Sequence, residues 1–260
     1  MTDRSEVAQR GPADGLRGRV TRYYGFREER HGPVRRREGP GTDVVIVISF
    51  DQDWLIDGAR HTSFVGGLRQ TQVTTEHGGR SFGMQIDLPP PAAHAILGLP
   101  LDELANDVVR LEDVLDEPSL VERLACAGDW HARFDLLDRV LSRRMADARP
   151  PSKEIAWAWE RLSASHGRIR VAQLARELGW SRRRLVAGFR EEIGLTPKAA
   201  ARVQRFEHTR AVAEMLVRPD WARIAVECGY YDQSHLINDF RVVTGQTPVT
   251  FFQDTATGTA

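Results

Sequence analysis

Two kinds of apolar spacing divide the chain near residue 150. Before that point, short apolar or alternating runs such as VVIVISFD (44–51) and SFGMQIDL (81–88) are broken by glycine pairs, as strands joined by tight turns are. Beyond it, apolar residues recur every three or four positions, and Ser, Thr, Asp or Gly stands at the segment ends, as in helices. The pattern predicts an α+β chain with a β-rich first domain, trailing helices and an all-α second domain.

The prolines of ARPPSKE (148–154) mark the domain boundary, because a proline pair interrupts a helical pattern. We predict a disordered tail over 1–14, a regulatory or dimerisation domain over 15–147 and a linker over 148–154. The helical domain follows over 155–253, and a second disordered tail over 254–260. Strands are expected over about 15–90 of the first domain.

A long amphipathic helix is predicted over 129–148 (DWHARFDLLDRVLSRRMADA). One of its faces is an apolar stripe. The stripe fits a helix that lies on its own domain, and it also fits a dimer seam; the sequence favours the first arrangement and leaves the second open. The stripe consists of Trp130, Phe134, Leu137, Leu141 and Met145.

Composition limits the classes of protein that fit. With 41% apolar and 28% charged residues, the chain is globular. Its N-terminus lacks the apolar core of a secretory signal, and no apolar run approaches the roughly 20 residues that span a membrane. We therefore expect a cytoplasmic protein without a membrane partner. Cys126 and Cys228 are too far apart for a disulfide or zinc motif, and we expect both to be core thiols.

The second half contains an internal repeat. LARELGWSRRRLVAGFREEIGLTP (174–197) and IAVECGYYDQSHLINDFRVVTGQTP (224–248) match in register. In each copy a short helix ends at Gly, an aromatic residue follows, and a second helix carries a spaced Leu and Phe before Gly-x-x-Pro. A short helix, a glycine suited to a left-handed turn and a crossing second helix form a helix-turn-helix, whose second helix enters the DNA major groove.

The chemistry of the second helices agrees with that role. The first copy is basic, with Arg182, Arg183, Arg184 and Arg190, and the second is polar, with Gln233, Ser234, His235 and Asn238. The half from residue 151 onward has 16 Lys and Arg against 12 Asp and Glu, although the whole chain has no net charge. A solvated charged face is the alternative for one such helix, but two in register favour DNA contact.

Residues 153–252 also resemble the DNA-binding domain of AraC-type bacterial transcription regulators. GYYDQSHLINDFRVVTGQTP follows that family's C-terminal signature, GWSRRRLVAGFREEIGLTP matches its first unit, and ARVQRFEHTRAV matches its connecting helix. The resemblance implies two helix-turn-helix units joined by one long helix. It further implies DNA contacts from Ser181, Arg182, Arg183, Val186, Ala187, Gln233, Ser234, Ile237 and Asn238.

Two departures from the family pattern change the expected readout. Asn238 stands where a basic residue is frequent, and Asp239 follows it. Val186 and Ala187 are small and apolar where polar readers are common. We therefore expect Arg182 to Arg184 to dominate affinity for DNA.

The same resemblance implies that the first half is a cupin-like regulatory domain that binds a small-molecule effector and dimerises. Possible pocket walls, chosen by composition alone, are Trp54, Phe64, Phe82 and Met84. His61, His77, His94 and His131 are too scattered for a metal site, so neither a metal nor a cofactor is expected.

Three functions stay open. The first is an effector-controlled transcription regulator, either activator or repressor, with promoter DNA, RNA polymerase and a second copy of the chain as partners. The second is a constitutive DNA-binding regulator whose first domain serves only dimerisation. The third is a DNA-repair enzyme with an attached helix-turn-helix domain, which would need a clustered, metal-activated cysteine nucleophile that this sequence lacks.

Overall fold

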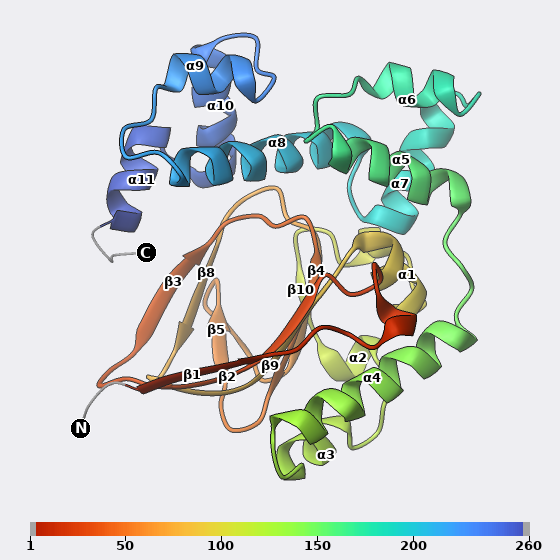
Figure 1. The fold of residues 1–260 in the computed structure, drawn as a ribbon, viewed down its shortest axis with the longest axis vertical. Coiled ribbons are helices and arrows are strands. Elements are labelled where there is room, and N and C mark those ends of the chain that lie inside the picture. The colour runs from red at the N-terminus through yellow and green to blue at the C-terminus, as the bar shows by residue number, and fades with distance from the viewer. Residues whose placement is uncertain (1–3, 257–260) are drawn as a thin grey trace.

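A computed structural model describes residues 4–256 as a β-rich domain beneath a helical one (Figure 1). Two antiparallel sheets form the first domain, and α8 of the second domain crosses above them. This arrangement confirms the predicted fold class. None of the described helices combines the length and apolarity needed to cross a membrane.

The larger sheet has six strands in the order β1-β2-β9-β4-β7-β10, and the smaller has four in the order β3-β8-β5-β6. Every pairing between these strands is antiparallel. In the larger sheet the bounds are β1 (Arg4–Gln9), β2 (Arg22–Glu29), β9 (Arg80–Leu88), β4 (Val44–Ser49), β7 (Phe64–Gly66) and β10 (Val108–Arg110). In the smaller they are β3 (Val34–Glu38), β8 (Val73–His77), β5 (Trp54–Ile56) and β6 (Ala59–His61).

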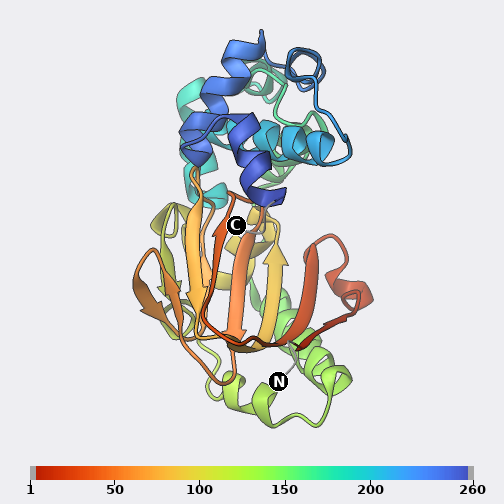
Figure 2. The ribbon, with the colours of Figure 1, turned by 90° about the vertical axis from the view of Figure 1, so that its left-hand side faces the viewer.

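Side-chain alternation gives the larger sheet two different faces. In β4, Val44, Ile46 and Ile48 point to one face and are fully buried, together with Met84 and Ile86 of β9. The helices of this domain cover that face (Figure 2). They are η1 (Asp14–Leu16), α1 (Pro90–Leu97), η2 (Leu101–Glu103), α2 (Leu111–Val114), α3 (Leu120–Cys126) and α4 (Trp130–Asp147).

The apolar stripe of α4 lies against this core. Phe134, Leu137 and Leu141 are at most 2% exposed, and Trp130 and Met145 pack against the same cluster. The prediction of a dimer seam is therefore wrong for this stripe, because its own domain already covers it. The other arrangement predicted for the helix, with α4 lying on its own sheet, is the one observed.

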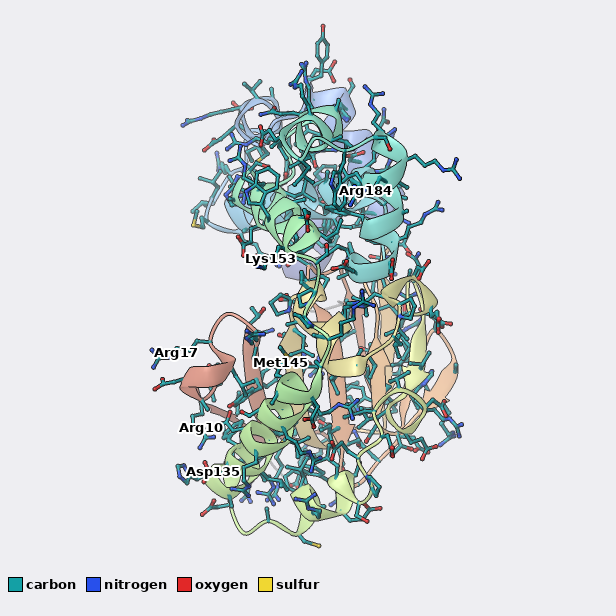
Figure 3. The ribbon with its side chains drawn as sticks, turned by 90° about the vertical axis from the view of Figure 1, so that its right-hand side faces the viewer. Arg10, Arg17, Asp135, Met145, Lys153 and Arg184 are labelled. Atoms are coloured by element: carbon teal, nitrogen blue, oxygen red, sulfur yellow. The ribbon has the colours of Figure 1, made fainter. Side chains whose placement is uncertain are left out.

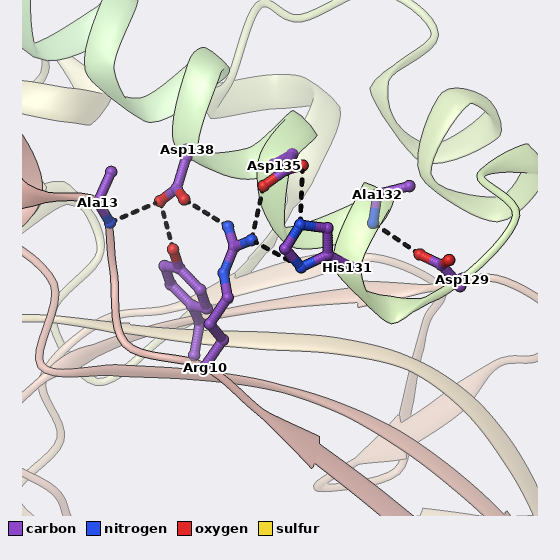
Figure 4. A network of polar contacts seen from close by, with 8 residues as sticks. Arg10, Ala13, Asp129, His131, Ala132, Asp135 and Asp138 are labelled. Carbon is purple, nitrogen blue, oxygen red and sulfur yellow. Dashed lines mark hydrogen bonds and ion pairs between the residues drawn. The ribbon is translucent and has the colours of Figure 1, made fainter.

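The N-terminal segment is ordered, so the predicted tail over 1–14 is wrong for residues 4–14; residues 1–3 lie outside the described range. β1 pairs with β2 along its whole length. Arg10 then reaches α4, where its guanidinium donates to Asp135 at 2.6 Å and to Asp138 at 2.5 Å (Figure 4). Tyr23 also donates to Asp138. These contacts tie the segment to the helix.

The helical domain has one core for each half of the repeat. Its helices are α5 (Lys153–Ala164), α6 (Val171–Glu177), α7 (Arg182–Ile193), α8 (Pro197–Glu214), α9 (Trp221–Glu227), α10 (Gln233–Thr244) and α11 (Pro248–Ala256). α8 contributes Ala200 and Val203 to the first core and Phe206 and Ala213 to the second. α11 occupies part of the segment predicted as a tail over 254–260, of which residues 257–260 lie outside the described range.

Candidate DNA-binding interface and pocket

The first helix-turn-helix unit is built from α6 and α7. Gly179 between them has a φ of +65°, which glycine adopts without strain. Ser181 caps α7 by accepting a hydrogen bond from the N–H of Arg184 at 3.2 Å. Leu185 and Phe189 are fully buried and dock α7 on the rest of the unit.

The opposite face of α7 is exposed and basic. The guanidinium of Arg184 lies 4.0 Å from the centre of the Trp180 ring, a cation–π contact that holds it beside the start of the helix. Figure 3 labels Arg184 on this face. Val186 is half-buried. The exposed predicted residues are Ser181, Arg182, Arg183, Arg184, Ala187 and Arg190.

The second unit repeats this construction with α9 and α10. Gly229 has a φ of +81°, and Asp232 caps α10 by accepting from the N–H of His235 at 2.8 Å. Leu236 and Phe240 are fully buried. Ile237 is half-buried, and the exposed predicted residues are Gln233, Ser234, His235 and Asn238.

Asp239 does not share the exposed face of α10. It is buried beneath the helix, where its carboxylate lies 3.4 Å from Arg202 and 3.4 Å from Arg205 of α8. The exposed first two turns of α10 are therefore neutral rather than acidic.

α8 holds the two units in a fixed relation. Both α7 and α10 pack on it, and they lie on the same side of the domain (Figures 2 and 3). Arg205 of α8 also donates to the carbonyl of Gly167 in the first unit at 2.9 Å. Two exposed helix faces thus point the same way from one rigid support.

A pocket of about 520 Å³ lies between the two sheets of the N-terminal domain. Trp54 and Phe64 line it, as predicted from composition. Phe82 and Met84 do not, because alternation along β9 turns Ser81 and Gln85 inward and these two outward. Phe82 packs on Phe50 and Trp130, and Met84 is buried in the helix-covered core.

Several lining residues escaped the sequence prediction. Alternation in RYYGFREE turns Tyr24, Phe26 and Glu28 toward the pocket, and in β4 it turns Val45 and Val47 there. The signal was present, but reading it required knowing which face of each strand the helices cover. The arginine-rich segment REERHGPVRRREGPG (27–41) contains β3, where Arg36 contacts the buried Glu28 at 2.8 Å.

The ionisable groups around the pocket are shifted from their ordinary values. Burial raises the pKa of Asp43 to about 6, against the hydrogen bond that Thr21 donates to it. For Glu28, burial alone would raise the pKa, but Arg36 and Arg30 outweigh it, so the net direction is downward. Burial lowers the pKa of His77, which favours a neutral ring.

The two cysteines differ in their exposure to solvent. Cys228 is buried, and burial raises the pKa of its thiol, which disfavours the nucleophilic thiolate. Cys126 is exposed, which corrects its prediction as a core thiol. Within residues 4–256, no group of three or more His, Cys, Asp or Glu side chains is arranged to hold a metal ion.

Two solved structures of ToxT from Vibrio cholerae are similar over most of both chains. The first, at 1.65 Å resolution, is 9% identical, covers 96% of this chain and 98% of its own, and has a TM-score of 0.44. The second, ToxT with an unsaturated fatty acid bound, is 13% identical, covers 86% and 96%, and has a TM-score of 0.45. Comparison with curated proteins found no match.

The family comparison is more specific. Residues 174–254 match the family described as "Helix-turn-helix domain". The matched range includes both recognition helices and the helix that joins them. Residues 174–254 therefore form a DNA-binding helix-turn-helix domain of the AraC/XylS type.

Proposed function

We propose that this protein is a sequence-specific transcription regulator that reads one operator with both helix-turn-helix units and responds to a small-molecule effector. One observation carries the proposal. The N-terminal halves of α7 and α10 are both exposed on the same side of α8, while Leu185, Phe189, Leu236 and Phe240 bury the opposite faces. Two helices so placed can enter successive major grooves on one side of DNA, about 34 Å apart.

The two units contact DNA through side chains of different chemistry. α7 supplies the cationic contacts to phosphate and guanine through Arg182, Arg183 and Arg184. α10 supplies neutral donors and acceptors through Gln233, Ser234 and Asn238, of which Gln and Asn suit adenine. The first unit therefore dominates affinity and its dependence on salt.

The pocket supports control by an effector. Its volume of about 520 Å³ falls within the range of small-molecule sites. Its walls combine apolar side chains such as Phe26, Val47 and Phe64 with eight charged ones, five of them arginines, a composition that suits a ligand with both an apolar body and a polar or anionic group.

Two segments at the rim of the pocket also touch the DNA-binding domain. Gly66, Gly67 and Arg69 line the pocket, and Leu68 between them is 2% exposed in the core of the first helix-turn-helix unit. On the other rim, Gly39 faces Phe206 in the core of the second unit, so that a side chain added at Gly39 would contact the Phe206 ring. A ligand that displaced either segment would therefore act directly on a DNA-reading unit.

We infer further that the protein is not an enzyme, that it works in the cytoplasm as a homodimer, and that RNA polymerase is a protein partner. The buried thiol of Cys228 supports the first inference over a DNA-repair enzyme. The dimer surface lies elsewhere than on the apolar stripe of α4, which its own domain covers.

The test is selection of random DNA duplexes by the full chain, with salt titrated from low to physiological concentration. A bipartite motif with halves about one helical turn apart is expected. Binding that is blind to sequence at every salt concentration would overturn the proposal. A thermal-shift screen of small molecules on the same chain then separates effector control from constitutive binding, since only the former gives ligands that also change operator affinity.

A further inference from the structure

Tyr231 stands immediately before α10 with 90% of its surface exposed. Within residues 4–256 it is the sole aromatic side chain among the exposed large apolar ones. Its neighbour Tyr230, by contrast, is 5% exposed and belongs to the core of the second unit. The chain thus places one tyrosine inside the unit and the next one outside it, at the edge that faces DNA in the proposed function.

The backbone of Tyr231 also fixes the ring of His235. The N–H of Tyr231 donates to Nδ1 of His235 at 3.3 Å, one turn into the helix. The ring of Tyr230 meets His235 edge-on, with centroids 5.2 Å apart and planes at 88°. Since Nδ1 accepts a hydrogen bond, the neutral imidazole carries its proton on Nε2. The exposed ring is therefore held as a hydrogen-bond donor.

The exposed start of α10 offers neutral hydrogen-bonding side chains. The exposed residues in the first two turns of α10 are Gln233, Ser234, His235 and Asn238, and none is a fixed cation. The first unit places Arg182, Arg183 and Arg184 at the corresponding position. A tyrosine hydroxyl donates to phosphate without a formal charge, so it positions a helix on DNA without releasing a further counterion.

We propose that Tyr231 and His235 form a paired DNA contact, in which the Tyr231 hydroxyl binds a backbone phosphate and Nε2–H of His235 donates to an acceptor on a base edge. The pairing rests on the proposed function, because it assigns roles within the DNA-reading edge of α10. Residues at the N-terminus of a recognition helix reach base edges, whereas those in the preceding turn approach the backbone. The positions of His235 in the first turn and Tyr231 before the cap match these two roles.

The phosphate contact is tested by Tyr231→Phe in the full chain, with a duplex carrying the motif that the wild-type chain selects. Loss of one hydrogen bond to a charged group predicts operator binding weaker by about 10-fold at every salt concentration, with the slope of log affinity against log salt unchanged. Tyr23→Phe is the matched control, because it removes a hydroxyl that donates to Asp138 in the N-terminal domain, away from both the pocket and the DNA-reading units. Equal operator affinity for Tyr231→Phe and wild type would overturn the phosphate contact.

A gain of charge gives an independent check. Tyr231→Lys brings a cation to the same place. The slope of log affinity against log salt should therefore become steeper by about one, for the one additional counterion released. Ala59→Lys adds the same charge at an exposed position of β6, outside the pocket, and should leave the slope as it is. If the slope is unchanged in Tyr231→Lys, no phosphate lies near residue 231 in the complex, and the phosphate contact is overturned.

The base contact is tested by repeating the selection with His235→Ala. The preference should be lost at one base pair in the half-site read by α10 and kept elsewhere. An unaltered motif would overturn the role of His235. If the wild-type chain itself selects no motif, the proposed function fails first; if it selects one that these variants leave intact, the paired contact alone fails.

Discussion

The backbone N–H of Gln72 donates to the carbonyl of Val243 at 2.9 Å, which joins the N-terminal domain directly to the second recognition helix. Gln72 follows β7 and precedes β8, so it belongs to the connection between the two sheets. The same connection carries Leu68, which is buried in the core of the first unit. One short segment of the N-terminal domain therefore touches both DNA-reading units.

This connection predicts that Leu68→Ala destabilises a domain to which Leu68 does not belong. Removing a buried leucine should cost about 2–5 kcal/mol of unfolding free energy. The loss should appear as faster amide exchange in α5 and α7, measured by hydrogen–deuterium exchange. Leu16→Ala, in the core of the N-terminal domain, is the control and should speed exchange in the sheets instead. Unchanged exchange in α7 of Leu68→Ala would contradict the coupling.

Arg183→Ala is expected to weaken operator binding by about 1–3 kcal/mol, since Arg183 is exposed on the N-terminal half of α7. If the lost contact is to phosphate, the slope of log affinity against log salt should also become shallower by about one. Fluorescence anisotropy with a labelled duplex at several salt concentrations measures both quantities. Arg35→Ala removes an exposed arginine of β3 and serves as the control. If Arg183→Ala binds the operator as tightly as the wild type does, α7 does not contact DNA as proposed.

Asp239→Asn should lower stability without changing the DNA motif. The carboxylate is buried between Arg202 and Arg205, and its loss leaves two cations near each other under α10. Because both contacts are 3.4 Å long, we expect a cost of about 1–3 kcal/mol, below that of an ideal buried pair. Urea unfolding measures the cost, and repeated duplex selection checks the motif. A changed base preference would mean that Asp239 faces DNA after all.

The sequence predicted the helix-turn-helix units well because their determinants are local. Gly179, Ser181 and Leu185 fix a turn, a cap and a buried face within seven residues, and Gly229, Asp232 and Leu236 do so within eight in the second copy. The inward position of Asp239 was not predictable in this way, because it depends on two arginines of α8 more than 30 positions earlier.

The pocket was only half predictable for the same physical reason. Trp54 and Met84 are equally apolar, but one faces the space between the sheets and the other faces the helices. A shift of one residue along a strand reverses the face, so only the pairing of β9 with β2 and β4 decides which side chains line the pocket. The segment of β1 likewise gave no strong local signal, since its order comes from pairing with β2 and from the contacts of Arg10 with α4.

The raised pKa of Asp43 predicts a stability that falls as pH rises. Burial holds the carboxyl pKa at about 6 in the folded chain, against about 3.9 when unfolded. The folded chain therefore binds this proton more tightly: the contribution of Asp43 to the free energy of unfolding is greatest below pH 4, declines between pH 4 and 6, and stays lower above that. Asp43→Asn, which keeps an acceptor for Thr21, should thus gain about 1–3 kcal/mol at pH 7.5 and nothing at pH 3.5. Chemical denaturation at both pH values measures the difference. Asp135→Asn should instead lower the stability at pH 7.5 and change it little at pH 3.5. The hydrogen bond from Arg10 lowers the pKa of Asp135, and the ion pair with Arg10 is lost when this carboxylate is neutralised. A gain for Asp43→Asn that is the same at pH 3.5 and pH 7.5 would show that packing, rather than the buried charge, sets the stability of this corner of the pocket.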